Sequence, residues 1–318
     1  MKAIVQNGYG SPDALQLREI DPPAVADDAI LVRIRAASIN ALDWYLLRRL
    51  AHVFARLFGK PLPRIRGADM AGIVEAVGRN VSRFKPGDEV FGVARGTFAE
   101  YATTTEARLA LKPRPLTFEQ AAAMPVAGFT ALQGLRDKAQ VHPGQKVLIY
   151  GAGGGTGTFA VQIAKAFGAR VTAVTRTEHV DLLRSIGADE VIDYTREEFT
   201  RRGERYDVVL DIGADRSPAD YARALMPNGK LVMVGAPKKP GALLARIVEA
   251  LILRGRDRRR IILSARASHE DLVALKELVE AGQLTPVIDR TYPLSEVPEA
   301  FRYFGTGGVR GKVVISIP

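Results

Sequence analysis

The sequence predicts an α/β protein of two domains, one built on a doubly wound parallel sheet and the other on a β-barrel. At 318 residues the chain is longer than a single ordinary hydrophobic core needs. Its middle part alternates short apolar runs with helical patterns, which is typical of βαβ units. Residues 1 to about 118 hold short β-like runs separated by Gly and Pro, which is typical of a partly closed antiparallel barrel.

The predicted parallel sheet is apolar along each strand, as expected when helices cover both of its faces. Its strands are placed at 146–150, 170–175, 190–194, 207–212 and 230–235. Helical patterns lie between them at 159–167, 180–186 and 218–225. Further on, helices are expected at 269–281 and near 299–304, and a last strand at 312–317. We expect this last strand to return to the first domain, so that the barrel comprises 1–118 completed by 286–318 and the parallel-sheet domain comprises 119–285.

The composition excludes several kinds of chemistry. The chain has no cysteine, which excludes disulfide scaffolds, thiol nucleophiles, iron–sulfur clusters and zinc sites built on thiolates. Its net charge is +10, but the basic residues are not interleaved with aromatic ones, so no nucleic-acid partner is expected. The missing cysteines fit a reducing compartment, and no apolar run follows the first residues. We therefore expect a cytoplasmic protein without a secretory signal.

Arginines gather in one short stretch near the end of the middle part. They are Arg254, Arg256, Arg258, Arg259 and Arg260. One interpretation is a solvated basic surface that attracts anionic ligands. The other is that residues 242–260 form an amphipathic basic surface that binds a membrane peripherally.

A glycine-rich loop follows the first strand of the parallel sheet and opens a helix. The sequence from residue 150 to 168 is YGAGGGTGTFAVQIAKAFG. Glycine allows a tight turn, close approach to a pyrophosphate and tight helix–strand packing, while the helix N-terminus offers N–H groups to phosphate oxygens. The loop therefore predicts a dinucleotide site, with candidate residues Ala152, Gly153, Gly154, Gly155, Thr156 and Gly157.

The end of the second strand indicates which dinucleotide binds. An NAD site would place an acid there for the ribose 2′-hydroxyl, whereas this chain has Thr175, Arg176 and Thr177. The planar fork of Arg176 suits a 2′-phosphate, although a surface arginine that begins a helix is the alternative. The predicted cofactor is NADP(H).

Four ordered motifs resemble one known superfamily. They are GADMAGIVEAVGRNVSRFKPGDEVFG (67–92), MPVAGFTALQGL (124–135), the glycine loop, and GADEVIDYT (187–195). The chain resembles the medium-chain dehydrogenase/reductase superfamily, and within it the zinc-independent quinone oxidoreductases and the enone (alkenal) reductases. The resemblance implies a Rossmann NADP-binding domain, a GroES-like substrate domain, a cleft joining them and a homodimer. It also implies hydride transfer to a quinone or to an α,β-unsaturated carbonyl as the small-molecule substrate.

The resemblance also implies roles for particular residues. The family's Ala-x-Gly-x-x-Gly falls on Ala152, Gly154 and Gly157. The adenosine 2′-phosphate would lie beside Tyr194, with Thr175, Arg176 and His179 at the second-strand end, and Val234 and Gly235 complete the expected cofactor set. Asn40 and Thr130 match positions near the nicotinamide and substrate. Tyr45 can donate to a substrate carbonyl, or Trp44 and Tyr45 can simply pack a helix onto the barrel.

No metal is expected. The zinc dehydrogenase branch has a Gly-His-Glu motif where this chain reads Gly67-Ala68-Asp69, and the other two ligand regions read Ser38-Ile39-Asn40 and Pro125-Val126-Ala127. The segment GTGGVRGKVV (305–314) is one residue too long for a phosphate loop and predicts a turn before a strand. Two alternatives stay open: an alcohol dehydrogenase-like oxidoreductase, and a weakly catalytic, nucleotide-binding protein associated with membranes.

Overall fold

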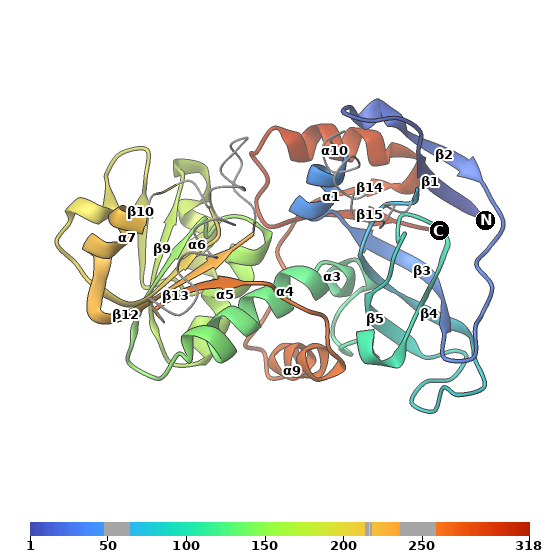
Figure 1. The fold of residues 1–318 in the computed structure, drawn as a ribbon, viewed down its shortest axis with the longest axis horizontal. Coiled ribbons are helices and arrows are strands. Elements are labelled where there is room, and N and C mark those ends of the chain that lie inside the picture. Colours follow the sequence, from blue (N-terminus) through green and yellow to red (C-terminus); the bar gives the residue numbers. More distant parts are fainter. Residues whose placement is uncertain (48–63, 214–215, 217, 236–258) are drawn as a thin grey trace. The chain divides into compact units, whose positions relative to one another are not determined.

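The chain folds into two compact units. The computed structural model describes residues 1–47, 64–213, 216, 218–235 and 259–318 (Figure 1). One unit comprises residues 1–127 and 267–318, and the other comprises residues 128–266. The segment 242–258, which holds most of the predicted basic surface, lies outside the described residues. Within the described ranges, no helix is long and apolar enough to span a membrane.

The unit of residues 128–266 is built on a six-stranded parallel sheet. Its strands are β8 (Lys146–Tyr150), β9 (Arg170–Thr175), β10 (Glu190–Asp193), β11 (Tyr206–Asp211), β12 (Leu225–Val234) and β13 (Arg260–Leu263). They lie in the order β10-β9-β8-β11-β12-β13, and every neighbouring pair is parallel. This is the doubly wound Rossmann order, so the predicted fold class is confirmed for this unit.

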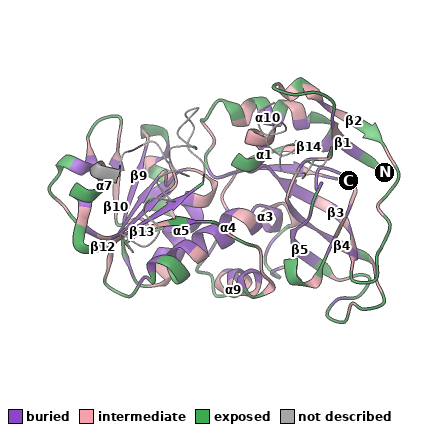
Figure 2. Ribbon diagram, in the orientation of Figure 1, coloured by how far each residue is buried: buried purple, intermediate pink, exposed green. Residues whose placement is uncertain are grey.

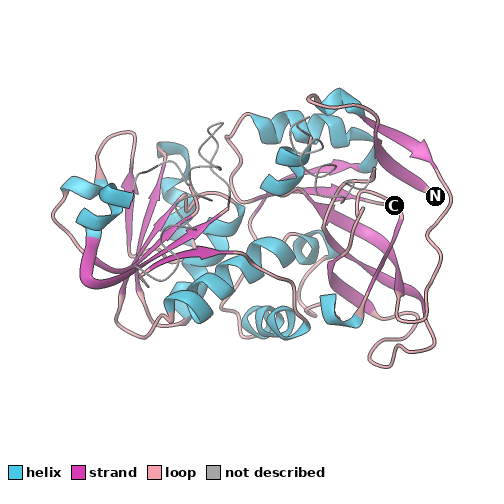
Figure 3. Ribbon diagram, viewed as in Figure 1, coloured by secondary structure: helices cyan, strands magenta, loops and turns pink. Residues whose placement is uncertain are grey.

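Helices follow the strands of this sheet in the predicted places, and Figure 3 shows them packed against it. They are α5 (Gly155–Ala166), α6 (Val180–Ser185) and α7 (Pro218–Ala224), with short 3₁₀ turns η4 (Thr177–His179) and η5 (Phe199–Arg201). Helix α4 (Pro125–Leu132) continues into a π-helical turn, η3 (Gln133–Ala139), which packs on β11, β12 and β13. Residues 147–150 of β8 are buried, because elements cover both faces of the sheet.

The other unit is built on a larger, mostly antiparallel sheet. The strands of this unit are β1 (Lys2–Gln6), β2 (Leu15–Glu19), β3 (Ile30–Ser38), β4 (Asp69–Val77), β5 (Glu89–Val93), β6 (Tyr101–Thr104), β7 (Leu109–Leu111), β14 (Ile288–Pro293) and β15 (Lys312–Ser316). The sheet order is β14-β15-β3-β4-β5-β7, with β6 paired to β3, and β1 and β2 form a separate ribbon. Strand β3 alternates buried and half-buried residues over Ile30–Arg35, as expected when one face lies on the core (Figure 2).

The last strand returns to this unit, as predicted. Strand β15 pairs antiparallel with β3, and Val314 lies opposite Ser38. Helices α1 (Ala41–Leu46), α3 (Phe118–Ala122), α9 (His269–Glu280) and α10 (Val297–Gly305) belong to the same unit, with short 3₁₀ turns η1 (Pro12–Ala14), η2 (Glu106–Arg108) and η6 (Leu294–Glu296).

The division between the units differs from the one expected at 118/119 and 285/286. It falls at 127/128 and 266/267, so α3 and α9 group with the antiparallel sheet. Helix α3 packs on β3, β4, β5 and β15, and α9 packs on β7 and η2. The His269 Nδ1 atom lies 2.6 Å from the carbonyl oxygen of Leu109, which ties the start of α9 to β7.

Candidate active site

The glycine loop turns directly from β8 into α5. Gly151 has φ +81°, a left-handed conformation that favours glycine. The N–H groups of Gly151 and Ala152 both lie 3.2 Å from the Val174 carbonyl oxygen, which fastens the loop to β9. A Cβ at Gly157 would lie 2.4 Å from the Ala152 carbonyl oxygen, so only glycine lets the helix pack this closely on the loop.

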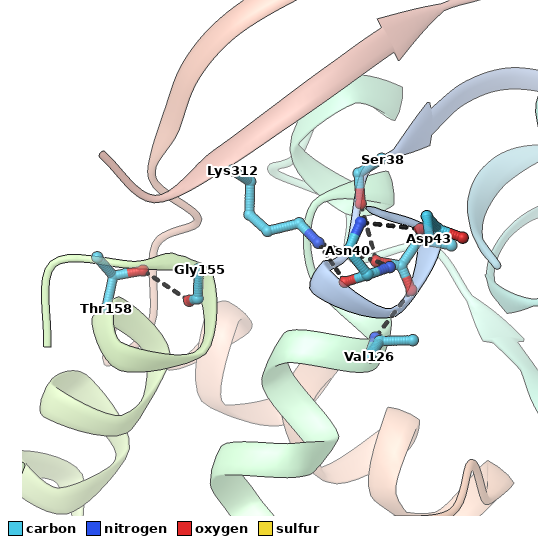
Figure 4. Close-up of polar contacts among 8 residues, drawn as sticks. Ser38, Asn40, Asp43, Val126, Gly155, Thr158 and Lys312 are labelled. Atoms are coloured by element: carbon cyan, nitrogen blue, oxygen red, sulfur yellow. Dashed lines mark hydrogen bonds and ion pairs between the residues drawn. The ribbon is translucent and has the colours of Figure 1, made fainter. Parts of the chain in front are cut away.

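The space beside Gly154 suits a phosphate group. Gly154 is the N-cap of α5 and has no side chain to accept from the N–H groups of the first turn. A Cβ built on it would meet only the Gly151 carbonyl oxygen, at 3.7 Å, within a 4 Å radius. The Thr158 hydroxyl in the first turn donates to the Gly155 carbonyl oxygen at 3.0 Å (Figure 4). These residues fit a dinucleotide pyrophosphate.

Thr175 and His179 pack against the glycine loop. Both side chains are buried. A Cβ at Gly153 would lie 2.0 Å from His179 Nδ1 and 2.8 Å from Thr175 Oγ1. The structure therefore brings Gly153, Thr175 and His179 together, and Arg176 follows Thr175 at the strand end with a half-buried side chain.

Tyr194 lies beside the same strand end. Its N–H donates to the Thr175 carbonyl at 2.9 Å, and its ring centroid is 6.2 Å from that of Tyr150. Val234 ends β12 and Gly235 follows it, and a Cβ at Gly235, whose φ is +75°, would meet no atom within 4 Å. Because all six strands are parallel, the residues that follow β8, β9, β10 and β12 lie along one edge of the sheet. That edge is where doubly wound sheets bind ligands.

The sequence reading overlooked an acid at this edge. Asp193 ends β10, and its carboxylate oxygens accept from Thr177 Oγ1 at 2.5 Å and from Thr195 Oγ1 at 2.7 Å. The hydrogen bond from Thr177 lowers the pKa of Asp193 below its ordinary value, so the carboxylate is ionised at neutral pH. The sequence signature of an NAD site is an acid at the end of the second strand, here β9, whereas Asp193 belongs to the neighbouring strand β10.

A second group of polar side chains lies in the other unit, around Asp69 (Figure 4). Asp69 is fully buried, and its Oδ2 accepts from Ser38 Oγ at 2.8 Å and from Asn40 Nδ2 at 2.9 Å. Its Oδ1 accepts from the Val126 N–H at 2.9 Å. The Lys312 Nζ lies 3.1 Å from Asp69 Oδ2 and 2.7 Å from Asn40 Oδ1. We call Ser38, Asn40, Asp69 and Lys312 the Asp69 cluster.

The register of three strands assembles the Asp69 cluster. Ser38 lies opposite Asp69 in the β3–β4 pair, and Val314 lies opposite Ser38 in the β3–β15 pair. Lys312 is two residues before Val314 and Asn40 is two residues after Ser38, so continuation of the antiparallel register puts Lys312 opposite Asn40. The Ile39 N–H donates to the Val313 carbonyl at 3.0 Å and holds this alignment.

Asp43 adds a further buried acid next to the cluster. Its Oδ2 accepts from the Asn40 backbone N–H at 2.8 Å and caps the start of α1. The pKa of Asp43 is raised to about 6, chiefly by burial and also by the nearby charge of Asp69, while the Asn40 hydrogen bond and the cations Lys312 and Arg66 act against this rise. Burial also lowers the pKa of Arg66.

Two further candidates, Thr130 and Tyr45, lie in helices. Thr130 is buried in α4, and Tyr45 is half-buried in α1. The Trp44 ring packs on Phe301 at 6.5 Å and on Phe304 at 6.4 Å between centroids. For Trp44 the packing interpretation therefore holds. The sequence reading missed Lys312, although a lysine that opens the apolar strand KVVIS is a recognisable signal of a buried partner.

Three segments that would supply metal ligands in the zinc branch do meet at Asp69. They carry a hydroxyl from Ser38, an amide from Asn40 and a backbone N–H from Val126, and Lys312 adds an ammonium. These groups donate hydrogen bonds to a carboxylate, and a lysine ammonium repels a cation. Across the described part of the chain, no group of three or more His, Cys, Asp or Glu residues is placed to hold a metal ion.

The fold and both groups of residues define a class, and comparisons with known proteins agree with it. The family model "Alcohol dehydrogenase GroES-like domain" matches residues 26–114, and the model "Zinc-binding dehydrogenase" matches residues 186–315. The chain belongs to the medium-chain dehydrogenase/reductase superfamily, in the branch of quinone oxidoreductases and alkenal/one oxidoreductases. The predicted GroES-like and Rossmann domains are thereby confirmed.

Particular relatives match over the whole chain. It is 37% identical to the 2-methylene-furan-3-one reductase of Solanum lycopersicum, over 99% of this chain and 79% of that protein. It is 34% identical to the chloroplastic NADPH-dependent alkenal/one oxidoreductase of Arabidopsis thaliana, with the same coverage of 99% and 79%. The solved quinone oxidoreductase from Coxiella burnetii has a TM-score of 0.88 and 31% identity, and the match covers 100% of this chain and 99% of that one.

Proposed function

We propose that this protein is a zinc-independent, NADPH-dependent oxidoreductase that transfers hydride to a quinone or to an α,β-unsaturated carbonyl. The observation that carries the proposal is the Asp69 cluster, in which Lys312 and three uncharged donors surround the carboxylate where the zinc branch assembles a metal site. A reductase of this type needs no metal, because the cofactor carries the hydride and the protein supplies binding and orientation.

The residues that would hold the cofactor lie at the carboxyl edge of the parallel sheet. The backbone of Gly153 to Gly157 and the first turn of α5 suit the pyrophosphate, because their N–H groups and the open side of Gly154 can receive it. Arg176 and Tyr194 would face the 2′-phosphate, with Thr175 and His179 holding the loop in place. When bound, the dihydronicotinamide supplies the hydride. The Arabidopsis relative named as NADPH-dependent supports this choice of cofactor.

Negative charge develops on the substrate oxygen during reduction, and a fixed donor stabilises it. Asn40 is our candidate for this donor. One N–H of its Nδ2 is used by Asp69, and the other has no acceptor among the described residues. The residue keeps 8% of its surface exposed, so it is not sealed from a ligand. Thr130 and Tyr45 remain further candidates for contacts to the substrate.

The substrate class is supported by the relatives. Those proteins are named for a methylene-furanone, for alkenals and alkenones, and for quinones, all of which are conjugated carbonyl compounds. Each of these compounds accepts hydride in conjugation with its carbonyl, and the carbonyl oxygen then gains the charge that a donor such as Asn40 stabilises.

The absorbance of NADPH at 340 nm, which falls when a quinone or carbonyl is reduced and rises when an alcohol is oxidised with NADP⁺, tests the proposal. The panel contains a simple quinone, a methyl vinyl ketone-type enone, the corresponding saturated ketone and a primary alcohol with NADP⁺. We expect turnover with the quinone or the enone and none with the saturated ketone or the alcohol. Turnover of the alcohol alone would indicate an alcohol dehydrogenase, and binding to anionic vesicles without any turnover would indicate the membrane-associated alternative.

A further inference from the structure

Lys312 is an unusual residue for the start of a buried strand. It opens β15 in the sequence KVVIS, and its side chain is only 3% exposed. Burying an ammonium is unfavourable unless it is paired and hydrogen-bonded. Lys312 has both kinds of partner, since its Nζ contacts Asp69 Oδ2 at 3.1 Å and Asn40 Oδ1 at 2.7 Å. A hydrophobic residue would fill this position without that cost, so the choice of lysine calls for a reason beyond packing.

The contacts of Lys312 and Asp69 fix which way the Asn40 amide points. The ammonium can only donate, and the ionised carboxylate can only accept. With Oδ1 on Lys312 and Nδ2 on Asp69, each end of the amide contacts a group of the complementary kind. A half-turn of the amide would put NH₂ against the ammonium and the carbonyl oxygen against the carboxylate, and both contacts would be repulsive. Lys312 and Asp69 therefore permit only the amide orientation in which Oδ1 contacts Lys312 and Nδ2 contacts Asp69.

The same contacts change what the amide can do. A cation on Oδ1 draws electron density from the amide, so its N–H groups become stronger donors, because hydrogen bonds in a chain polarise one another. One N–H of Nδ2 is spent on Asp69, and the second has no acceptor among the described residues. Asp69 in turn accepts from Ser38, Asn40, Val126 and Lys312, so the carboxylate that anchors the arrangement has no spare capacity to rearrange.

We infer that Lys312 and Asp69 are positioning residues, which hold and polarise the Asn40 amide so that its second N–H donates to the substrate carbonyl oxygen as negative charge develops there. The inference rests on the proposed function and assigns a role within it to two residues of the barrel unit. In this role Lys312 acts through Asn40, which its Nζ contacts directly.

A mutant cycle on kcat tests this inference. Lys312→Met alone would leave Asp69 buried and unpaired and can unfold the protein, so the cycle uses the charge-neutral pair Asp69→Asn/Lys312→Met. Asn40→Ala is the second arm, and it keeps the half of the α1 capping box in which Asp43 accepts from the backbone N–H of residue 40. The three variants and the wild type are compared with NADPH and the best substrate of the panel, and folding is checked by thermal unfolding.

We expect Asn40→Ala to lower kcat by about 100-fold, as removal of one oxyanion donor does. We expect Asp69→Asn/Lys312→Met to lower kcat by at least about tenfold while the Kd for NADPH stays unchanged, since most of the donor's effect depends on its orientation. The triple variant should match Asn40→Ala within about twofold, because residues that act through one another are not additive. If Lys312 and Asp69 had only a structural role, the kcat of the triple variant would be lowered by the product of the two separate losses.

Lys112 provides a matched control in the same unit. It is the other buried, paired lysine of the described barrel, with a side chain 8% exposed and its Nζ 3.2 Å from Glu89 Oε2, and it has no contact with the Asp69 cluster. Lys112→Met should change kcat by less than about twofold. Two results would overturn the role of Lys312 while the proposed function stands. One is a triple variant whose kcat is lowered by the product of the two separate losses, and the other is a wild-type kcat in the Asp69→Asn/Lys312→Met variant. A wild type without turnover on any quinone or enone would overturn both.

Discussion

Gly154→Val separates cofactor binding from folding at the glycine loop. Gly154 has φ −84° and ψ 177°, an extended conformation that β-branched residues favour. A Cβ there would meet only the Gly151 carbonyl oxygen, at an ordinary contact distance of 3.7 Å. Because valine is a poorer N-cap residue than glycine, we expect the free energy of unfolding to fall by only about 1 kcal/mol. The two methyl groups would stand in the open space proposed for the pyrophosphate and should weaken NADPH binding by at least ~100-fold, or ~2.7 kcal/mol.

Gly157→Val is the contrasting variant in the same loop. Its Cβ would lie 2.4 Å from the Ala152 carbonyl oxygen and 2.5 Å from that of Gly151, and neither backbone atom can move without shifting the loop. We expect this variant to lose about 3 kcal/mol or more of stability, as overpacked sites do. Isothermal titration with NADPH and urea unfolding of both variants supply the measurements. A Gly154→Val protein that binds NADPH with wild-type affinity would refute the assignment of the loop.

Three other predictions concern specificity, pH and metal. Arg176→Ala should raise the KM for NADPH by about ten- to a hundredfold, because it removes one charge-assisted hydrogen bond to a phosphate. The KM for NADH should stay unchanged, and an equal rise in both KM values would contradict the contact between Arg176 and the 2′-phosphate. The pKa of Asp43 is raised, chiefly by burial, from 3.8 to about 6, so the folded state holds this proton after the unfolded state has released it. The free energy of unfolding should therefore fall by about 2 kcal/mol between pH 4 and 6. Asp43→Asn should lack this fall in urea titrations across that range, and an identical slope in both proteins would contradict it. Prolonged dialysis against a strong chelator should leave the NADPH-dependent activity intact, whereas activity restored only by added Zn²⁺ would show that a metal is required.

The strands of the parallel sheet were predictable where their residues are apolar and β-branched. Strands β8 and β9 begin and end at the predicted residues. Strand β13 was missed because it spans only four residues, RIIL, at the end of the arginine-rich stretch. Strand β14 was missed because it is an edge strand without a buried residue, and its sequence IDRTYP shows no hydrophobic alternation. Pairing with β15 stabilises it, and that pairing is not visible in a local window.

The two groups of site residues differ in how far the sequence could reveal them. The glycine loop is local, since the strand, turn and helix that form it are consecutive, and its residues were identified directly. The Asp69 cluster joins Ser38 and Asn40 to Lys312 across more than 270 residues of chain, and its geometry depends on the register of β15 against β3. Asp193 likewise lies beside the end of β9 because β10 pairs with β9, and not because the two segments are consecutive in the sequence. Sequence patterns describe each strand but not the residues that face each other across strands.

Transfer of deuterium from labelled cofactor tests the central claim of a metal-free NADPH-dependent reductase most directly. The chelator-treated protein is incubated with an enone and NADPH that carries deuterium at C4 of the nicotinamide, in separate experiments for the two stereoisomers. With one of the two stereoisomers, the account predicts one deuterium per product molecule, bonded to the former β-carbon, and no loss of activity from chelation. A reduced product without deuterium from either stereoisomer, or activity abolished by the chelator and recovered with Zn²⁺, would contradict it.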